Sequence, residues 1–258
     1  MNRFGLLLAR FLEKPLSHPP PFDAVDPAAL HACLRPGDVL LVEGTSRISL
    51  AVKYLTQSTW SHAALYVGDA LMKIRPGAPA GALIEADLER GVIAVPLAKY
   101  AAANTRICRA VGLTPDDCRA VVSYMIDSLG KHYDLRNVVD LMRYLLPQPP
   151  VPLRWRRRML ALGSGDPTRA ICSTLIAQAF QSVRYPILPQ VSSVFVEGGG
   201  KGQTLIGELQ HIRHHSLFTP RDFDVSPYFQ IVKPSIERNF DYKTMRWVEP
   251  PGERPGVA

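Results

Sequence analysis

The segment that decides the fold is "TRAICSTLIAQAFQSV", which runs from Thr168 to Val183. Its apolar residues recur at spacings of three and four, which predicts an amphipathic helix with one face on a core. These residues are Ile171, Leu175, Ile176, Ala179, Phe180 and Val183. Cys172 lies near the helix start, where the positive end of the helix dipole favours the nucleophilic thiolate. Buried cysteines also serve as plain packing residues, so a catalytic Cys172 requires a base from elsewhere in the chain.

A second possible helix start lies a few residues upstream. In "SGDPTRAIC", Asp166 is an alternative N-cap and Pro167 suits the first helical position. The helix would then begin earlier and Cys172 would lie in its second turn, which weakens the dipole argument.

The composition is that of a globular protein. The chain has 258 residues, of which 47% are hydrophobic and 21% charged, so it can bury a substantial core. Its four cysteines, Cys33, Cys108, Cys118 and Cys172, are widely scattered and include no CxxC pair. We therefore expect reduced thiols and predict neither a zinc ribbon nor a thioredoxin-like motif.

The net charge of +7 indicates an anionic partner. The densest basic cluster is "LRWRRRML", with Arg154, Arg156, Arg157 and Arg158 around Trp155. No helix-turn-helix, zinc-finger or RNA-binding signature accompanies it, so the sequence favours an anionic membrane or an acidic substrate over nucleic acid. A solvated basic loop is the plain alternative.

The N-terminal segment "MNRFGLLLARFLEKPL" does not fit a secretory signal, because Arg10 interrupts the apolar run and no small-residue cleavage site follows. Wound as a helix, it gathers Phe4, Leu8, Phe11 and Leu12 on one side. That stripe suits either a membrane-surface anchor or packing onto the domain itself. We expect a cytoplasmic protein, with peripheral attachment to the inner membrane as an open alternative.

The rest of the chain is predicted to combine strands and helices. We expect strands at Val39–Val42 and within "WSHAALYVGD", "ALIEADLERGVIAVPL" (two strands), "TRICRAV" and "YFQIVK", and helices within "SRISLAVKYLTQS", "LTPDDCRAVVSYMIDSLG" and "FTPRDF". The clearest helix start is at Thr114, which is a good N-cap with Pro115 at the first helical position and Asp117 closing a capping box.

Composition divides the chain into three parts. Residues 1–29 hold the apolar stretch and a proline-rich linker, residues 30–235 the folded domain, and residues 236–258 a tail whose end, "VEPPGERPGVA", we expect to be disordered. Two stretches within the domain, residues 145–168 and 186–216, are predicted to be insertions, the second of them a mobile loop.

His62 is the best-placed general base. In its predicted strand, His62, Ala64 and Tyr66 point to one face, and rigid neighbours can fix the imidazole ring. If the next strand pairs with it in an antiparallel hairpin, Glu85 can accept the second ring N–H and hold the tautomer. Asp87 is the reserve carboxylate, two residues on along the same face. A purely structural hydrogen bond is the plain alternative role for a strand histidine.

Six motifs occur in one order along the chain: "RPGDVLLVEG", "WSHAALYVG", "ALIEADLERGV", "GKHYD", "ICSTLIAQAF" and "FTPRDF". Together they resemble the YiiX/YebB-like cysteine hydrolases, circularly permuted relatives of the NlpC-type papain-fold enzymes. In that family a histidine strand precedes the cysteine helix, and a carboxylate on the strand after the histidine completes the triad. The resemblance extends over most of Leu34 to Lys233 and implies that His62, Glu85 and Cys172 occupy the catalytic positions.

The resemblance also singles out Tyr133 in "GKHYD". NlpC-type enzymes carry a Gly-x-x-Tyr element whose hydroxyl helps to hold the oxyanion, and Tyr133 matches it. The backbone N–H of Cys172 would supply a second donor, as a helix N-terminus does. Tyr133 could equally be an apolar packing residue with its hydroxyl in solvent.

A zinc site is a competing hypothesis. In "LQHIRHHS", His211 and His215 lie four residues apart and would share one face of a helix. No glutamate lies between them as in HExxH, and the flanking sequence is typical of a loop, so the sequence favours thiol over metal catalysis.

We therefore predict an α+β fold of the circularly permuted papain-like (NlpC) type, with an antiparallel sheet packed against the helix that carries Cys172. The implied activity is that of a cysteine hydrolase needing no metal or organic cofactor: His62 activates Cys172, which attacks the carbonyl of a peptide-like amide or a lipid-linked acyl group. Lipid acyl transfer at a membrane and a catalytically idle acyl- or peptide-binding module are the alternatives. The sequence does not indicate an oligomeric state.

Overall fold

The computed structural model describes residues 26–87, 89–131, 171–197, 204–211, 213–237, 241 and 243. Eight strands occur in this part of the chain: β1 (Val39–Val42), β2 (His62–Gly68), β3 (Ala82–Asp87), β4 (Gly91–Pro96), β5 (Thr105–Ala110), β6 (Gln190–Glu197), β7 (Thr204–His211) and β8 (Phe229–Val232). The α-helices described are α2 (Pro27–Cys33), α3 (Arg47–Thr56), α4 (Ala70–Ile74), α5 (Pro115–Asp127), α8 (Ile171–Ser182), α9 (Pro220–Val225) and α10 (Pro234–Glu237), and the short 3-10 helices are η1 (Leu97–Tyr100) and η2 (His215–Leu217).

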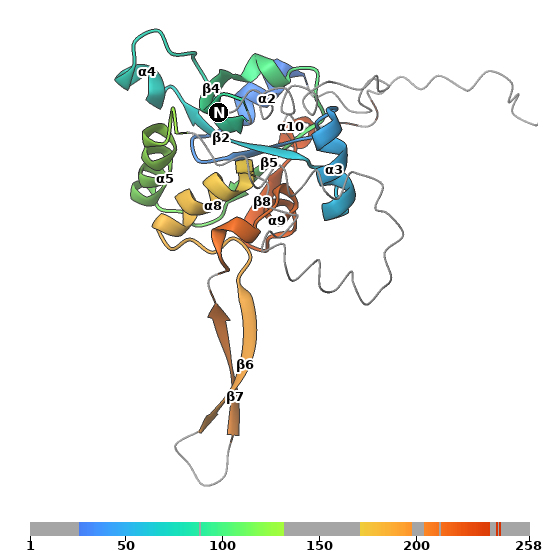
Figure 1. The fold of residues 1–258 in the computed structure, drawn as a ribbon, viewed down its shortest axis with the longest axis vertical. Coiled ribbons are helices and arrows are strands. Elements are labelled where there is room, and N and C mark those ends of the chain that lie inside the picture. Colours follow the sequence, from blue (N-terminus) through green and yellow to red (C-terminus); the bar gives the residue numbers. More distant parts are fainter. Residues whose placement is uncertain are drawn as a thin grey trace, which may run out of the picture.

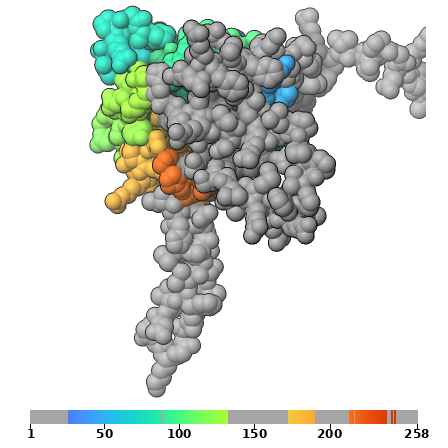
Figure 2. All heavy atoms as spheres, viewed as in Figure 1, coloured from blue at the N-terminus to red at the C-terminus, as the bar shows by residue number. Residues whose placement is uncertain are grey.

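An antiparallel sheet forms the centre of the molecule, with strand order β4-β3-β2-β1-β5-β8 in the described residues. Helices cover both faces of this sheet (Figure 1). On one face α8 packs against β2 and β3 and α5 packs against β2 and α8. Figure 2 shows α4, α5 and α8 following one another along one flank of the domain. On the other face lie α2 and η1. The α+β class and the antiparallel sheet predicted from the sequence are thus confirmed.

The period-two pattern of β2 distributes its side chains between two cores as predicted. Ala64 and Tyr66 pack with residues of α2 and η1, such as Leu30 and Leu97. The alternate residues of β2 pack with the helices of the opposite face; they are Ala63, Leu65 and Val67. Glu85 follows Ile84 on β3, and Ile84 is the register partner of Leu65, so Glu85 belongs to the α2 and η1 side.

Local signals in the sequence account for the helix starts. The Thr114 hydroxyl accepts the Asp117 N–H at 3.1 Å and α5 begins with Pro115, as predicted. Thr219 caps α9, where the Asp222 carboxylate accepts the Thr219 N–H at 2.6 Å in a capping box. The predicted strand at Val39–Val42 is also confirmed, and each of its four residues is buried.

The irregular loop predicted over residues 186–216 is instead largely a pair of strands. Strands β6 and β7 pair antiparallel over their whole length, from Gln190 opposite His211 to Glu197 opposite Thr204. They form a two-stranded ribbon that extends away from the main sheet (Figure 1). Strand-forming residues flank the run "GGGKG" on both sides, a sequence pattern that indicates two paired strands rather than one irregular segment.

Candidate active site

The first residue of β2 is His62, and the chain that leads into it is held by several contacts. The Ser61 N–H donates to the Val42 carbonyl at 3.2 Å, and the Ser61 hydroxyl accepts the Gly44 N–H at 2.9 Å. The indole N–H of buried Trp60 donates to the Asp224 carboxylate at 3.0 Å. The backbone position of His62 is therefore fixed from β1 and from α9.

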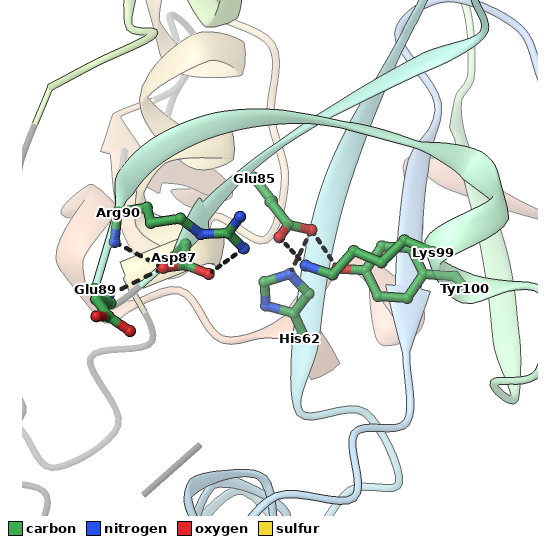
Figure 3. A network of polar contacts seen from close by, with 7 residues as sticks. All are labelled: His62, Glu85, Asp87, Glu89, Arg90, Lys99 and Tyr100. Atoms are coloured by element: carbon green, nitrogen blue, oxygen red, sulfur yellow. Dashed lines mark hydrogen bonds and ion pairs between the residues drawn. The ribbon is translucent and has the colours of Figure 1, made fainter. Parts of the chain in front are cut away.

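Glu85 lies beside the His62 ring (Figure 3). The distance from His62 Nε2 to Glu85 Oε2 is 3.2 Å, and the glutamate side chain is only 2% exposed. Because an ionised carboxylate only accepts hydrogen bonds, the proton of this contact belongs to Nε2. The nitrogen left to face Cys172 is then Nδ1.

Cys172, the second residue of α8 as described, lies on the other side of the imidazole. It is buried at 7% exposure, and a side-chain hydrogen bond joins it to His62. The backbone N–H groups of Ala63 and Ser173 also donate to its sulfur. The Ser173 hydroxyl donates to the Phe218 carbonyl at 2.9 Å and so anchors this end of α8. The structure thus brings Cys172, His62 and Glu85 together in one line of contacts.

These contacts shift the pKa values of the thiol and the imidazole in opposite directions. Burial alone would raise the pKa of Cys172, but the His62 imidazolium and the N–H donors outweigh it and lower that pKa. Burial alone would lower the pKa of His62, but Cys172 and Glu85 raise it to about 10. Both shifts favour the thiolate and imidazolium forms of the pair. Burial raises the pKa of Cys108 and Cys118 above the ordinary thiol value.

Two further residues of this site, Lys99 and Tyr100, were missed by the sequence analysis. Both come from η1 and both donate to Glu85: the Lys99 ammonium to Oε1 and the Tyr100 hydroxyl to Oε2 (Figure 3). Burial alone would raise the pKa of Glu85, but the bonds from His62, Lys99 and Tyr100 lower it to about 2. The segment "PLAKY" carries no catalytic motif, so only the path of the chain after β4 reveals these residues.

Asp87, the reserve carboxylate, serves the turn between β3 and β4. Its Oδ1 accepts the backbone N–H groups of Glu89 at 3.0 Å and Arg90 at 2.8 Å, and its Oδ2 accepts the Arg90 guanidinium at 3.2 Å. Figure 3 shows Asp87 turned towards these residues, whereas Glu85 is turned towards His62. The geometry favours Glu85 as the partner of the imidazole.

Several predicted features lie outside the described residues. These are Tyr133, the alternative cap at Asp166 and Pro167, the arginine cluster around Trp155 and the N-terminal apolar stripe. Within the described part of the chain, no helix has both the length and the apolar character needed to cross a bilayer.

The zinc hypothesis required His211 and His215 on one helix, and the fold does not provide this. His211 ends β7, whereas His215 begins η2. The ring of His215 lies against that of its neighbour His214, with centroids 4.1 Å apart. No group of three or more His, Cys, Asp or Glu side chains placed to hold a metal ion occurs among the described residues.

No family model and no curated protein matches the chain. Among solved structures, the chain is similar to the crystal structure of the metalloprotein YiiX from Escherichia coli O157:H7. The two are 16% identical with a TM-score of 0.45, and the match covers 77% of this chain and 96% of that chain.

Proposed function

We propose that this chain is a cysteine hydrolase that cleaves an amide or ester bond through an acyl-enzyme on Cys172. The observation that carries the proposal is the line of contacts from the Cys172 thiol through the His62 ring to the Glu85 carboxylate. A nucleophile, a base and a group that orients the base are the three parts that covalent acyl transfer requires.

The proposed first step is attack of the Cys172 thiolate on the substrate carbonyl carbon. A C–S bond forms and the carbonyl oxygen takes the electron pair as an oxyanion, which the backbone N–H of Cys172 and the Tyr133 hydroxyl are proposed to stabilise. The His62 imidazolium then gives its proton to the leaving nitrogen or oxygen as the bond to that atom breaks. An acyl thioester on Cys172 remains.

The proposed second step is hydrolysis of this thioester. The neutral His62 ring accepts a proton from water, whose oxygen attacks the thioester carbonyl, and the C–S bond breaks to release a carboxylic acid and the thiolate. Glu85 keeps the proton on Nε2 throughout, so that Nδ1 is the nitrogen that exchanges protons with Cys172 and the substrate. Each transfer uses side chains of the chain itself.

The substrate is proposed as a class, a peptide-like amide or a lipid-linked acyl group. Trapping the acyl-enzyme tests the activity: the protein is incubated with activated esters of short and long acyl chains and with peptide anilides. Intact and peptide mass spectrometry then locates the adduct. We expect one acyl group on Cys172, absent from Cys172→Ser. An idle binding module would retain the ligand without a covalent adduct.

YiiX is described as a metalloprotein, so metal-assisted hydrolysis is the alternative that a test of the thiol mechanism must separate. Treatment with EDTA separates the two mechanisms. The thiol mechanism predicts full activity after chelation and loss of activity after alkylation of Cys172. Two results together would favour the metal mechanism. Alkylation of Cys172 would leave the activity unchanged, and chelation would abolish an activity that added zinc restores.

A further inference from the structure

The short helix η1 delivers two donors to one buried carboxylate. Adjacent residues Lys99 and Tyr100 reach different oxygens of Glu85, and Oε2 also holds His62 Nε2 at 3.2 Å (Figure 3). The Tyr100 side chain is buried and its ring lies 6.1 Å from that of His62. Both Glu85 oxygens are therefore occupied by donors, which fixes the plane of the carboxylate against the imidazole.

The charges along this line alternate in sign. They run from the Cys172 thiolate to the His62 imidazolium, the Glu85 carboxylate and the Lys99 ammonium. Glu85 is 2% exposed, so water does not screen its charge, whereas Lys99 is 36% exposed and keeps part of its hydration. Asp87, the next carboxylate on β3, is bonded to its own turn. Lys99 is thus a second cation in contact with Glu85, through the carboxylate oxygen that His62 does not contact.

We propose that Lys99 and Tyr100 are positioning residues of the hydrolase site, Lys99 as the counter-ion that holds Glu85 ionised and Tyr100 as the donor that aims the carboxylate at His62. This proposal rests on the proposed function, because it concerns the same Cys172–His62 pair. Neither residue need touch the substrate. Both act on the thiolate through Glu85 and the imidazole.

Removal of the Lys99 charge should shift the pH profile of Cys172 reactivity in one direction, to higher pH. A lost positive charge destabilises the nearby thiolate and makes protonation of Glu85 easier, and both effects raise the pH at which Cys172 becomes reactive. The same loss favours the protonated form of His62, so the alkaline limb of the pH profile also moves up. The Lys99→Gln variant removes the charge but keeps a donor for Glu85, and Lys99→Arg keeps both.

The experiment measures the rate of Cys172 alkylation by iodoacetamide against pH, with mass mapping of the modified residue. For Lys99→Gln we expect both limbs to move to higher pH, so that the rate on the acidic limb falls by about threefold to tenfold. Lys99→Arg should retain the wild-type profile. So should Lys73→Gln, which removes one charge from exposed α4. A Lys99→Gln profile that superimposes on the wild type would overturn the role of Lys99.

Tyr100→Phe tests the other half of the proposal and keeps it testable if Lys99→Gln does not fold. It removes a neutral donor, so the pH limbs should stay in place while kcat falls and KM does not change. An unchanged kcat would overturn the role of Tyr100. If the wild-type Cys172 itself reacts no faster than Cys108 at mildly acidic pH, the proposed function fails instead, so the two failures are distinguishable.

Discussion

Two buried ion pairs lie on the same sheet, and they differ in whether their charges can change. Asp38 is 2% exposed, and its two oxygens accept Arg109 Nε at 2.9 Å and a terminal guanidinium nitrogen of the same residue at 2.7 Å. Glu85 is equally buried, but it contacts His62, which in turn is hydrogen-bonded to the Cys172 thiol. An arginine stays protonated in proteins, whereas histidine and cysteine gain and lose protons near neutral pH. The first pair has the features of a structural tie, and the second those of a chemical site.

The remaining hydrogen bonds of the Asp38–Arg109 pair go to the protein backbone. Arg109 donates in addition to the Cys33 carbonyl at 2.6 Å, and Asp38 accepts the Arg35 N–H at 2.8 Å. Its partners therefore join the end of α2 to β5. The comparison predicts that changes at the Glu85 end alter chemistry and that changes at the Asp38 end alter stability.

The largest expected effect is that of His62→Ala. Without the imidazole, Cys172 loses the group that holds it as thiolate and that passes protons to the leaving group, so kcat/KM should fall by several orders of magnitude. The free energy of unfolding should also fall, because the ring is only 23% exposed and its contacts with Glu85 and Cys172 are lost, so the kinetics are measured on the folded fraction. Steady-state kinetics and urea denaturation measure the two quantities. Retention of near wild-type turnover would remove His62 from the mechanism.

Glu85→Gln should come next in size. The amide keeps the shape of the carboxylate but not its charge and can present N–H to the ring, so kcat should fall by up to about 10⁴, as for the aspartate of serine-protease triads. Asp87→Asn is the matched control, since it changes a carboxylate two residues away that contacts the turn. Full activity in Glu85→Gln together with an inactive, folded Asp87→Asn would show that Asp87 is the partner of His62.

Asp38→Asn should lower stability and leave activity unchanged. It leaves the Arg109 charge partly buried without its counter-ion, which costs about 3 kcal/mol of unfolding free energy, the low end for a broken buried pair because Arg109 keeps 18% exposure. The kcat of the folded protein should be unaffected. Urea denaturation and activity at low urea measure this. A loss of activity without loss of stability would contradict the distinction between the two ion pairs.

The smallest expected effect concerns membrane binding, which we propose from the sequence. The apolar stripe in residues 1–14 and the arginine cluster around Trp155 should together bind anionic vesicles, at about 1 kcal/mol for each basic residue near the surface. Co-sedimentation should rise with phosphatidylserine content, fall with salt and drop when residues 1–14 are deleted. If the protein does not sediment with anionic vesicles even at low salt, the proposed membrane binding is wrong.

The sequence predicts more of this site than of its surroundings, for a physical reason. His62 and Glu85 lie on adjacent antiparallel strands, so the period-two rule was sufficient to place them on one side of the sheet. The cysteine helix was visible from its apolar spacing. Lys99 and Tyr100 reach Glu85 only because the chain after β4 turns back as η1, a tertiary path that no local pattern encodes. The β6–β7 ribbon was missed because its glycine run was interpreted as a loop.

The most direct test of the central claim is the pH dependence of alkylation at each of the four cysteines, mapped by mass spectrometry in the wild type and in His62→Ala. With the pKa of Cys172 lowered and that of His62 raised to about 10, the ion pair forms as pH rises through the thiol pKa and is lost as pH rises past the imidazolium pKa.

We therefore expect Cys172 of the wild type to react at mildly acidic pH, well before Cys108 and Cys118, and His62→Ala to shift its reaction to the alkaline range of an ordinary thiol. Equal rates at all four cysteines, or a Cys172 profile that His62→Ala leaves unchanged, would contradict this expectation.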